Sequence, residues 1–134
     1  MEKIKVMLDT SAYSAFLRGN EAVKLAIGVA DEIYLNPVVV GELYAGFAHG
    51  GREKKNREIL KEFLASPRVQ VAVIDEETSE RYAAIIAYLW VKGTPIPIND
   101  LWIAATSMQY GLKLVTTDGH YRQLPQIIVE WCTV

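Results

Sequence analysis

Four acidic residues of the sequence lie in apolar surroundings, where a carboxylate is costly unless it is paired, hydrogen-bonded or bound to a cation. Asp9 directly follows the apolar stretch IKVML, and Asp118 directly follows KLVTT. Glu42 interrupts the run VVVGELYAGF, and Asp100 begins the segment DLWIAA after a loop that contains two prolines. Most of the other acids lie in mixed, charged segments, where solvation is a sufficient explanation. These four carboxylates are therefore the candidates for chemistry.

A bound cation is what four neighbouring carboxylates need, because like charges within a few ångströms repel strongly. Oxygen ligands, a single cysteine (Cys132) and the lack of paired histidines favour Mg²⁺ over zinc, with Mn²⁺ as a plausible substitute. One carboxylate can deprotonate a metal-bound water while the ion neutralises the charge that grows on a phosphate. The pattern therefore favours metal-dependent hydrolysis of phosphodiester bonds.

Each of these acids also has an explanation that involves no ligand. Asp9 and Asp100 stand at expected helix starts, where free backbone N–H groups and the helix dipole favour an acid. Asp118 and Gly119 could form no more than a turn. Glu42 is the hardest to explain in this way, because a helix as apolar as 37–48 gains nothing from it. The expected convergence of all four at one edge of a sheet favours the functional interpretation.

Strands that alternate with helices must position these acids. The pattern predicts strands at 4–8, 33–35, 69–74, 112–115 and 127–129, and helices at 9–17, 21–30, 37–48, 52–65, 76–91 and 99–110. The strands are rich in β-branched residues and leucine, which indicates an α/β fold: a three-layer α/β/α sandwich around a parallel sheet. The sequence does not specify the strand order. Sites in such sheets lie at the carboxyl ends of the strands, where we expect the four acids to meet.

The second half of the helix 76–91 is apolar nearly all round, so we expect it to be buried on several sides.

Length and composition indicate one domain, 1–134. Hydrophobic residues are 51% and charged residues 22% of the chain, the balance of a soluble globular protein. The longest uncharged apolar run in an expected helix, Tyr82 to Val91, is far shorter than the ~20 residues of a membrane span. The start MEKIKVMLDT has no secretory signal, and with a single cysteine this indicates the cytoplasm. We therefore exclude membrane, secreted and fibrous proteins, whereas the net charge of −2 leaves nucleic-acid binding open.

The stretches MLDTSAYSAFLRG, NPVVVGELYAGF, PINDLWIAATSMQYGLKLVTTDGHYRQLP and IIVEW resemble the PIN domain, and more closely its VapC-type toxin branch. The resemblance covers nearly the whole chain, in order and at typical spacing. It implies a Mg²⁺-dependent endoribonuclease that is the toxin component of a type II toxin–antitoxin pair and cleaves RNA with a metal-activated water. It also implies a parallel sheet, a homodimer and inhibition by a small cognate antitoxin.

Carried over by position, the resemblance assigns site residues. The acidic quartet of the family matches Asp9, Glu42, Asp100 and Asp118, as catalytic residues and metal ligands. Ser11 and Thr116 match positions whose hydroxyls support the metal site or its waters. Two departures concern the residues after the fourth acid: Gly119 and His120 stand where other members vary, and Tyr121 stands where a phenylalanine is common. Both leave the substrate preference unspecified.

Other residues are weaker candidates. Arg18, at the end of the first helix, is the best candidate for a phosphate contact. His120 could donate a proton to a leaving group, but an isolated histidine in a loop is a weak signal. A cationic side chain of an antitoxin could occupy the acidic pocket. Its peptide is expected along an apolar groove near Tyr44 and Phe47.

Three alternatives remain. The nearest is a PIN-domain nuclease that processes RNA outside toxin systems, from which a neighbouring antitoxin gene would distinguish a toxin. A phospho-acceptor signalling domain has a similar size and acidic metal pocket, but it pairs two acids after the first strand, where this chain has Thr10 and Ser11 after Asp9. An inactive PIN-like interaction module would have an incomplete quartet, and the quartet here is complete.

Overall fold

Short aliphatic runs form the strands and amphipathic segments form the helices, much as their periodicity predicts. A computed structural model describes residues 2–134, which hold five strands, six α-helices and one short 3-10 helix. The strands are β1 (Lys5–Leu8), β2 (Glu32–Leu35), β3 (Val69–Val71), β4 (Lys113–Thr116) and β5 (Ile128–Trp131). The helices are α1 (Thr10–Leu17), α2 (Glu21–Val29), α3 (Pro37–His49), α4 (Glu53–Leu64), α5 (Glu76–Lys92), α6 (Ile98–Tyr110) and the 3-10 helix η1 (Gly119–Gln123).

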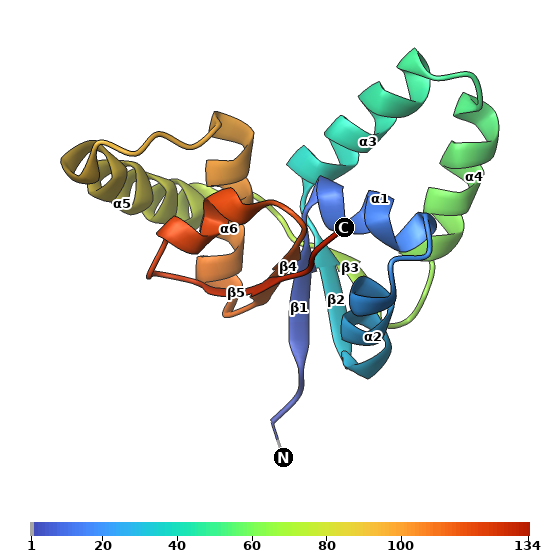
Figure 1. Cartoon of the computed structure of the whole chain (residues 1–134), viewed down its shortest axis with the longest axis horizontal. Coiled ribbons are helices and arrows are strands. Elements are labelled where there is room, and N and C mark those ends of the chain that lie inside the picture. Colours follow the sequence, from blue (N-terminus) through green and yellow to red (C-terminus); the bar gives the residue numbers. More distant parts are fainter. Residues whose placement is uncertain (1) are drawn as a thin grey trace.

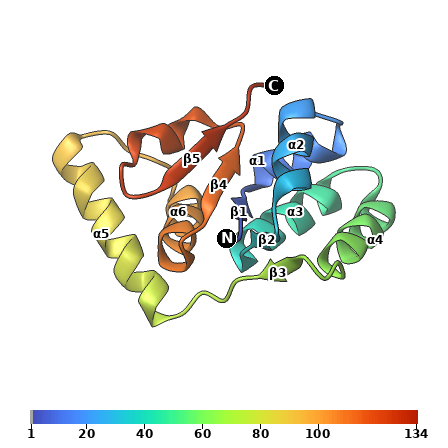
Figure 2. The ribbon, with the colours of Figure 1, turned by 90° about the horizontal axis from the view of Figure 1, so that it is seen from below.

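The strands form one parallel sheet in the order β3-β2-β1-β4-β5. The first three strands are added in one direction from β1 to the edge strand β3. The chain then crosses back to β4 on the other side of β1, so the direction in which strands are added reverses. Because right-handed crossovers are strongly preferred, this reversal moves the connecting helices to the other face. Figures 1 and 2 show α5 and α6 on one side of the sheet and α1, α2 and α4 on the other. The predicted three-layer α/β/α sandwich is confirmed.

The reversal makes the boundary between β1 and β4 the topological switch point, where open α/β sheets form their binding crevice. The two strands pair in register, with Met7 opposite Leu114 and Leu8 opposite Val115. Positions more than a hundred residues apart in the chain therefore end side by side. Asp9 is the first residue after β1, and Asp118 is the second after β4.

The core is continuous through the central strands. Val6, Met7 and Leu8 are all fully buried, as are Leu114 and Val115. A strand that is buried on both faces shows an unbroken apolar run rather than alternation, which explains the sequence of β1 and β4. The strands at the switch point are thus a rigid platform for the residues that follow them.

The third strand is shorter than predicted and ends at Val71 instead of residue 74. Ala72 still donates its backbone N–H to the carbonyl of Leu35, but Val73 is 62% exposed. β3 is an edge strand, and the alternation of valines that suggested a longer strand continues past the end of its partner β2. The last strand also differs from its predicted bounds, because it begins one residue later and ends two residues later, at 128–131 instead of 127–129.

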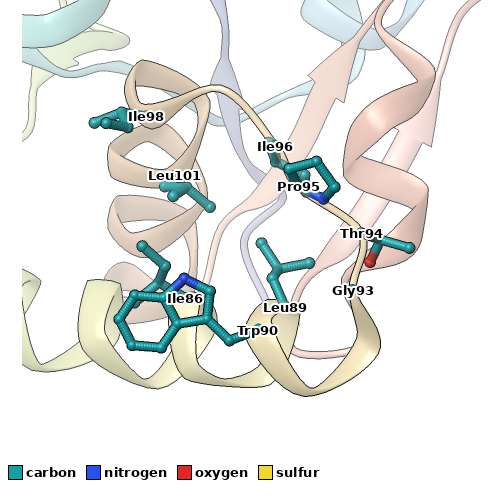
Figure 3. A pocket seen from close by; sticks show the side chains of 9 residues that line it. All are labelled: Ile86, Leu89, Trp90, Gly93, Thr94, Pro95, Ile96, Ile98 and Leu101. Atoms are coloured by element: carbon teal, nitrogen blue, oxygen red, sulfur yellow. The ribbon is translucent and has the colours of Figure 1, made fainter.

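The prediction for the second half of α5 is wrong. Ile85 and Leu89 are buried, but Trp90 is 74% and Val91 is 89% exposed. α5 packs along α6 at the periphery of the molecule, which covers only one stripe of the helix (Figure 2). Its C-terminal end borders an apolar hollow of about 290 Å³ that Trp90, Ile96 and Ile98 help to line (Figure 3).

Among residues 2–134, no helix combines the length and the apolar content that crossing a bilayer requires.

Candidate active site

The four carboxylates come from four different parts of the fold and meet in one cavity. The cavity has a volume of about 290 Å³ and lies at the carboxyl end of the sheet. Its lining consists of Asp9, Thr10, Ser11, Ser14, Glu42, Asp100, Ile103 and Asp118. The expected convergence is therefore present in the structure.

Asp9 is both the N-cap of α1 and a wall of the cavity. Its Oδ1 accepts hydrogen bonds from the backbone N–H of Ala12 and from Ser11 Oγ, each at 2.8 Å. Its Oδ2 accepts a hydrogen bond from Thr116 Oγ1 at 2.6 Å. Burial raises the pKa of Asp9, its hydrogen bonds oppose that rise, and the charge of Asp118 adds to it. Capping is thus part of how this carboxylate is fixed, and it leaves Asp9 lining the same cavity as the other acids.

Ser11 and Thr116 connect the ends of β1 and β4. Both hydroxyls donate to Asp9, and their oxygen atoms lie 3.3 Å apart. Ser11 Oγ accepts the N–H of Thr117 at 3.1 Å, and Thr116 Oγ1 accepts the N–H of Asp118 at 2.9 Å. The two hydroxyls therefore fix both the Asp9 carboxylate and the backbone that carries Asp118.

Glu42 lies in the second turn of α3 and is held from both sides by neutral donors. Thr10 Oγ1 donates to its Oε1 at 2.5 Å, and Asn99 Nδ2 donates to its Oε2 at 3.2 Å. Neither Thr10 nor Asn99 was among the predicted site residues. Their signal was available, because each directly adjoins one of the candidate acids, Asp9 or Asp100.

Asp100 is not the residue that opens its helix. α6 begins at Ile98 with Pro97 as its N-cap, and no side chain caps it, so an expected start at position 99 or 100 is one or two residues late, respectively. Asp100 is the third residue of the helix. Burial, followed by the charges of Asp118, Asp9 and Glu42, raises its pKa from 3.8 to about 6. Capping therefore does not explain Asp100, and its neighbours make its charge unfavourable.

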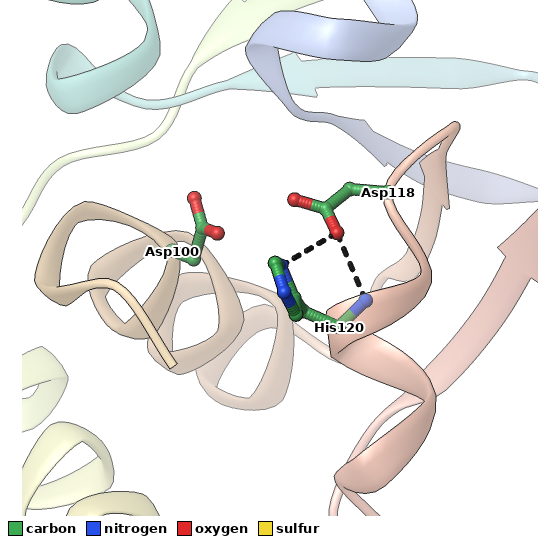
Figure 4. Close-up of side chains that lie close together, drawn as sticks. All are labelled: Asp100, Asp118 and His120. Atoms are coloured by element: carbon green, nitrogen blue, oxygen red, sulfur yellow. Dashed lines mark hydrogen bonds and ion pairs between the residues drawn. The ribbon is translucent and has the colours of Figure 1, made fainter. Parts of the chain in front are cut away.

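Asp118 ends the loop after β4 and caps η1, so its interpretation as a turn residue is correct as far as it goes. Its Oδ1 accepts the backbone N–H of His120 at 2.9 Å and also lies 2.8 Å from His120 Nδ1. One possible ligand atom from each of Asp100, Asp118 and His120 lies within 4.8 Å of the others. Figure 4 shows these three side chains pointing toward one another.

Tyr121 forms the buried side of this cluster. Its side chain is fully buried, and its hydroxyl makes no hydrogen bond of good geometry among residues 2–134. The hydroxyl still lies close enough to Asp100 to lower the pKa of that carboxyl. Burial and the neighbouring charges of Asp9 and Asp100 raise the pKa of Tyr121, so the hydroxyl stays protonated. A buried hydroxyl of this kind is costly unless an oxygen or nitrogen atom accepts its proton.

A divalent cation fits this donor set. Oxygen atoms dominate it, two of the carboxylates have raised pKa values, and the buried hydroxyl beside them makes no hydrogen bond of good geometry. No lysine or arginine of the part of the chain that the structure describes lies within 4.0 Å of the four carboxylates. The negative charge is therefore not neutralised by the protein itself.

Two predicted residues lie outside the cavity. Arg18 is at the C-terminal end of α1, about 12 Å along the helix from the end that carries Asp9. It lines a separate hollow with Asn20 and Val134.

The apolar groove expected near Tyr44 and Phe47 is only partly present. Phe47 is 8% exposed and belongs to the core, so the prediction that it lines a groove is wrong. Tyr44, which is exposed, instead borders a hollow with residues of α4.

Residues 6–127 match the sequence profile of the PIN domain. The chain belongs to the PIN-domain family. Two relatives are Ribonuclease VapC of Rickettsia bellii, 31% identical over 92% of this chain and 93% of that one, and Ribonuclease VapC4 of Mycobacterium tuberculosis, 32% identical over 69% and 71%. The acids of this PIN domain thus stand in a fold that known ribonucleases share.

Solved structures agree with the fold. VapBC2 of Rickettsia felis, bound to a DNA fragment from its promoter, superimposes with a TM-score of 0.85 at 22% identity, covering 96% of this chain and 99% of that one. FitAcB of Neisseria gonorrhoeae superimposes with a TM-score of 0.74 at 29% identity, covering 92% and 95%. The phospho-acceptor alternative is wrong, because those domains have the strand order 2-1-3-4-5 and this PIN domain has 3-2-1-4-5.

Proposed function

We propose that this PIN domain is a divalent-metal-dependent endoribonuclease that acts as the toxin of a type II toxin–antitoxin pair. The observation that carries the proposal is the meeting of Asp9, Glu42, Asp100 and Asp118 in one cavity at the switch point of the sheet. The relatives named Ribonuclease VapC support RNA as the substrate. Mg²⁺ is the proposed ion and Mn²⁺ its substitute, because the donors are mostly hard oxygen atoms.

The hydrogen-bond partners of the four acids suggest different roles for them. Asp9, Asp100 and Asp118 are proposed to hold the ion, with Ser11 and Thr116 orienting Asp9. When bound, the ion supplies charge neutralisation at the scissile phosphate and a more acidic water. Glu42, held by Thr10 and Asn99, adds a fourth carboxylate and is suited to orient the attacking water and accept its proton at a carboxylate oxygen. Arg18 remains a proposed contact for the RNA beyond the cavity.

Purified protein and a panel of RNAs test this proposal, with structured transfer and ribosomal RNA included and the cut ends mapped. We expect cleavage with Mg²⁺ or Mn²⁺, none with a chelator, and none in Asp9→Asn. The same rate in Asp9→Asn as in the unchanged protein, or full activity in the chelator, would contradict the proposal.

The proposed partner is a cognate antitoxin, which the likeness to VapBC complexes supports. A cationic antitoxin side chain is expected to enter the acidic cavity, where no lysine or arginine of residues 2–134 neutralises the carboxylates. The rest of the antitoxin is expected near Tyr44, whose ring lies 4.2 Å below the Arg57 guanidinium carbon at the α3–α4 hollow. Expression should be toxic alone and tolerated with the partner. A nuclease that processes RNA outside toxin systems, the second candidate, predicts no such rescue.

A homodimer and a location in the cytoplasm complete the proposal. Sedimentation of the purified chain tests the first, and fractionation of the cells that express it tests the second.

A further inference from the structure

His120 is the residue of the cluster that the four acids do not account for. The chain has two histidines, and the other, His49, ends α3. His120 Nδ1 lies 2.8 Å from Asp118 Oδ1, and the His120 side chain is 55% exposed. Its backbone N–H also binds Asp118, so η1 places the imidazole beside the carboxylate. The local structure therefore places the imidazole beside Asp118, one of the acids that line the cavity.

The spacing of these atoms suits ligands of a single ion. With metal–ligand bonds of about 2.1 Å, adjacent ligands of an octahedron are roughly 3 Å apart and opposite ones roughly 4.2 Å apart. The 2.8 Å between His120 Nδ1 and Asp118 Oδ1 corresponds to an adjacent pair. The ligand atoms of Asp100, Asp118 and His120 all lie within 4.8 Å of one another, so the three can surround one ion after small side-chain rotations (Figure 4).

Tyr121 supplies a second sign of a ligand at this place. It directly follows His120, its side chain is fully buried, and its hydroxyl makes no hydrogen bond of good geometry among residues 2–134. The hydroxyl lies close enough to Asp100 to lower the pKa of that carboxyl, which places it at the cluster. A water coordinated there is the kind of partner that the hydroxyl requires.

We propose that His120 is a nitrogen ligand of the metal ion, together with Asp100 and Asp118, and that it raises the affinity of the site for Mn²⁺ relative to Mg²⁺. The inference rests on the proposed function, which gives the cavity a divalent ion. Mg²⁺ prefers oxygen ligands, whereas an imidazole adds more to the affinity for first-row transition metals. A site of carboxylates alone shows less of this preference. The residue two positions after Asp118 thus changes the relative affinity of the site for the two ions.

Pulsed electron paramagnetic resonance of Mn²⁺ tests the ligand directly, because it detects the ¹⁴N nucleus of a coordinated imidazole. The protein should be untagged, so that the two histidines of the chain are the sole sources of this signal. His120→Ala removes the proposed ligand, and His49→Ala is the matched control. Calorimetric titrations of the same three proteins with Mn²⁺ and with Mg²⁺ give the ion preference.

We expect the ¹⁴N coupling in the unchanged protein and in His49→Ala and its loss in His120→Ala. The Mn²⁺ affinity of His120→Ala should fall about tenfold, with a smaller change for Mg²⁺. Bound Mn²⁺ without ¹⁴N coupling overturns the inference and leaves the proposed function intact, provided that Asp100→Asn abolishes the binding. No bound Mn²⁺ in the unchanged protein overturns both.

Discussion

The two ends of the sheet treat acidic residues in opposite ways. At the amino-terminal end, Glu32 lies 3.3 Å from Lys3 and accepts a hydrogen bond from Tyr34 Oη at 2.6 Å. These contacts, the Tyr34 bond first, lower the pKa of Glu32. At the carboxyl end, burial and neighbouring carboxylates raise the pKa of Asp100 to about 6. One end neutralises its acids internally, and the other keeps an excess of negative charge that a cation from outside can neutralise.

The donors at the carboxyl end sharpen this contrast. Asp9 and Glu42 are held by hydroxyls, an amide and a backbone N–H, all of which orient a carboxylate without cancelling its charge. Neutral donors fix geometry and leave the electrostatic demand in place. A stability-driven site would use lysine or arginine here, as the Lys113–Glu130 pair at 2.7 Å does elsewhere in the sheet. The arrangement is the one expected for binding an ion.

Asp100→Asn should give the largest effect, because it removes a charge from the unneutralised end. We expect RNA cleavage to fall about 100-fold or more. Thermal stability without metal should stay equal or rise, since repulsion with Asp118, Asp9 and Glu42 is relieved. The matched control is Glu32→Gln at the other end, which should keep full activity. Equal losses of activity in both variants would remove the distinction between the two ends.

Metal ions should stabilise the protein through the carboxyl end alone. With Mg²⁺ or Mn²⁺ at a hundred times its dissociation constant, binding adds about 2.7 kcal/mol to the free energy of unfolding. The melting temperature should therefore rise with either ion in the unchanged protein and in Glu32→Gln. It should not rise in Asp100→Asn. Stabilisation that persists in Asp100→Asn would place the ion at a different site.

Thr116→Val tests whether neutral donors are needed to hold the acids. The change keeps the shape and removes the 2.6 Å hydrogen bond to Asp9 together with the acceptor for the Asp118 N–H. We expect a loss of about 1–3 kcal/mol in the free energy of unfolding, measured with denaturant in a chelator. Activity should fall about tenfold, through a misplaced Asp9. Full activity with unchanged stability would show that Thr116 does not position the carboxylate.

The sequence was sufficient to select the four acids as candidates, but it did not identify the polar residues that bind them. The reason is energetic. A carboxylate in an apolar segment has a cost that is visible in the sequence, so Glu42 and Asp118 could be selected without coordinates. Thr10 and Asn99 carry no such cost, because neutral polar residues are common at helix starts. Their contacts to Glu42 span 32 and 57 positions and depend on how the helices pack.

The fold shows the same division. Alternating strands and helices predicted a parallel sheet, but nothing local to β1 specifies that β4 lies beside it. Hydrophobicity also misled at α5, where Trp90 and Val91 are apolar but lie on the outer surface of a peripheral helix. An apolar residue type favours burial, but tertiary packing determines whether a given apolar side chain is buried.

The pH dependence of stability should have opposite slopes at the two ends of the sheet. Asp100 has a pKa of about 6 in the folded protein against an ordinary value of 3.8. Between these values the folded state holds more protons than the unfolded state, so stability without metal falls as pH rises from about 4 to 6 and is level above. Glu32 has a lowered pKa, so its contribution is present at neutral pH and is lost as pH falls below its ordinary value. Denaturant unfolding in a chelator, from pH 4 to 7, should show a smaller fall with rising pH in Asp100→Asn and a larger one in Glu32→Gln. If the profiles of both variants ran parallel to that of the unchanged protein, the two ends would not differ in how they hold charge.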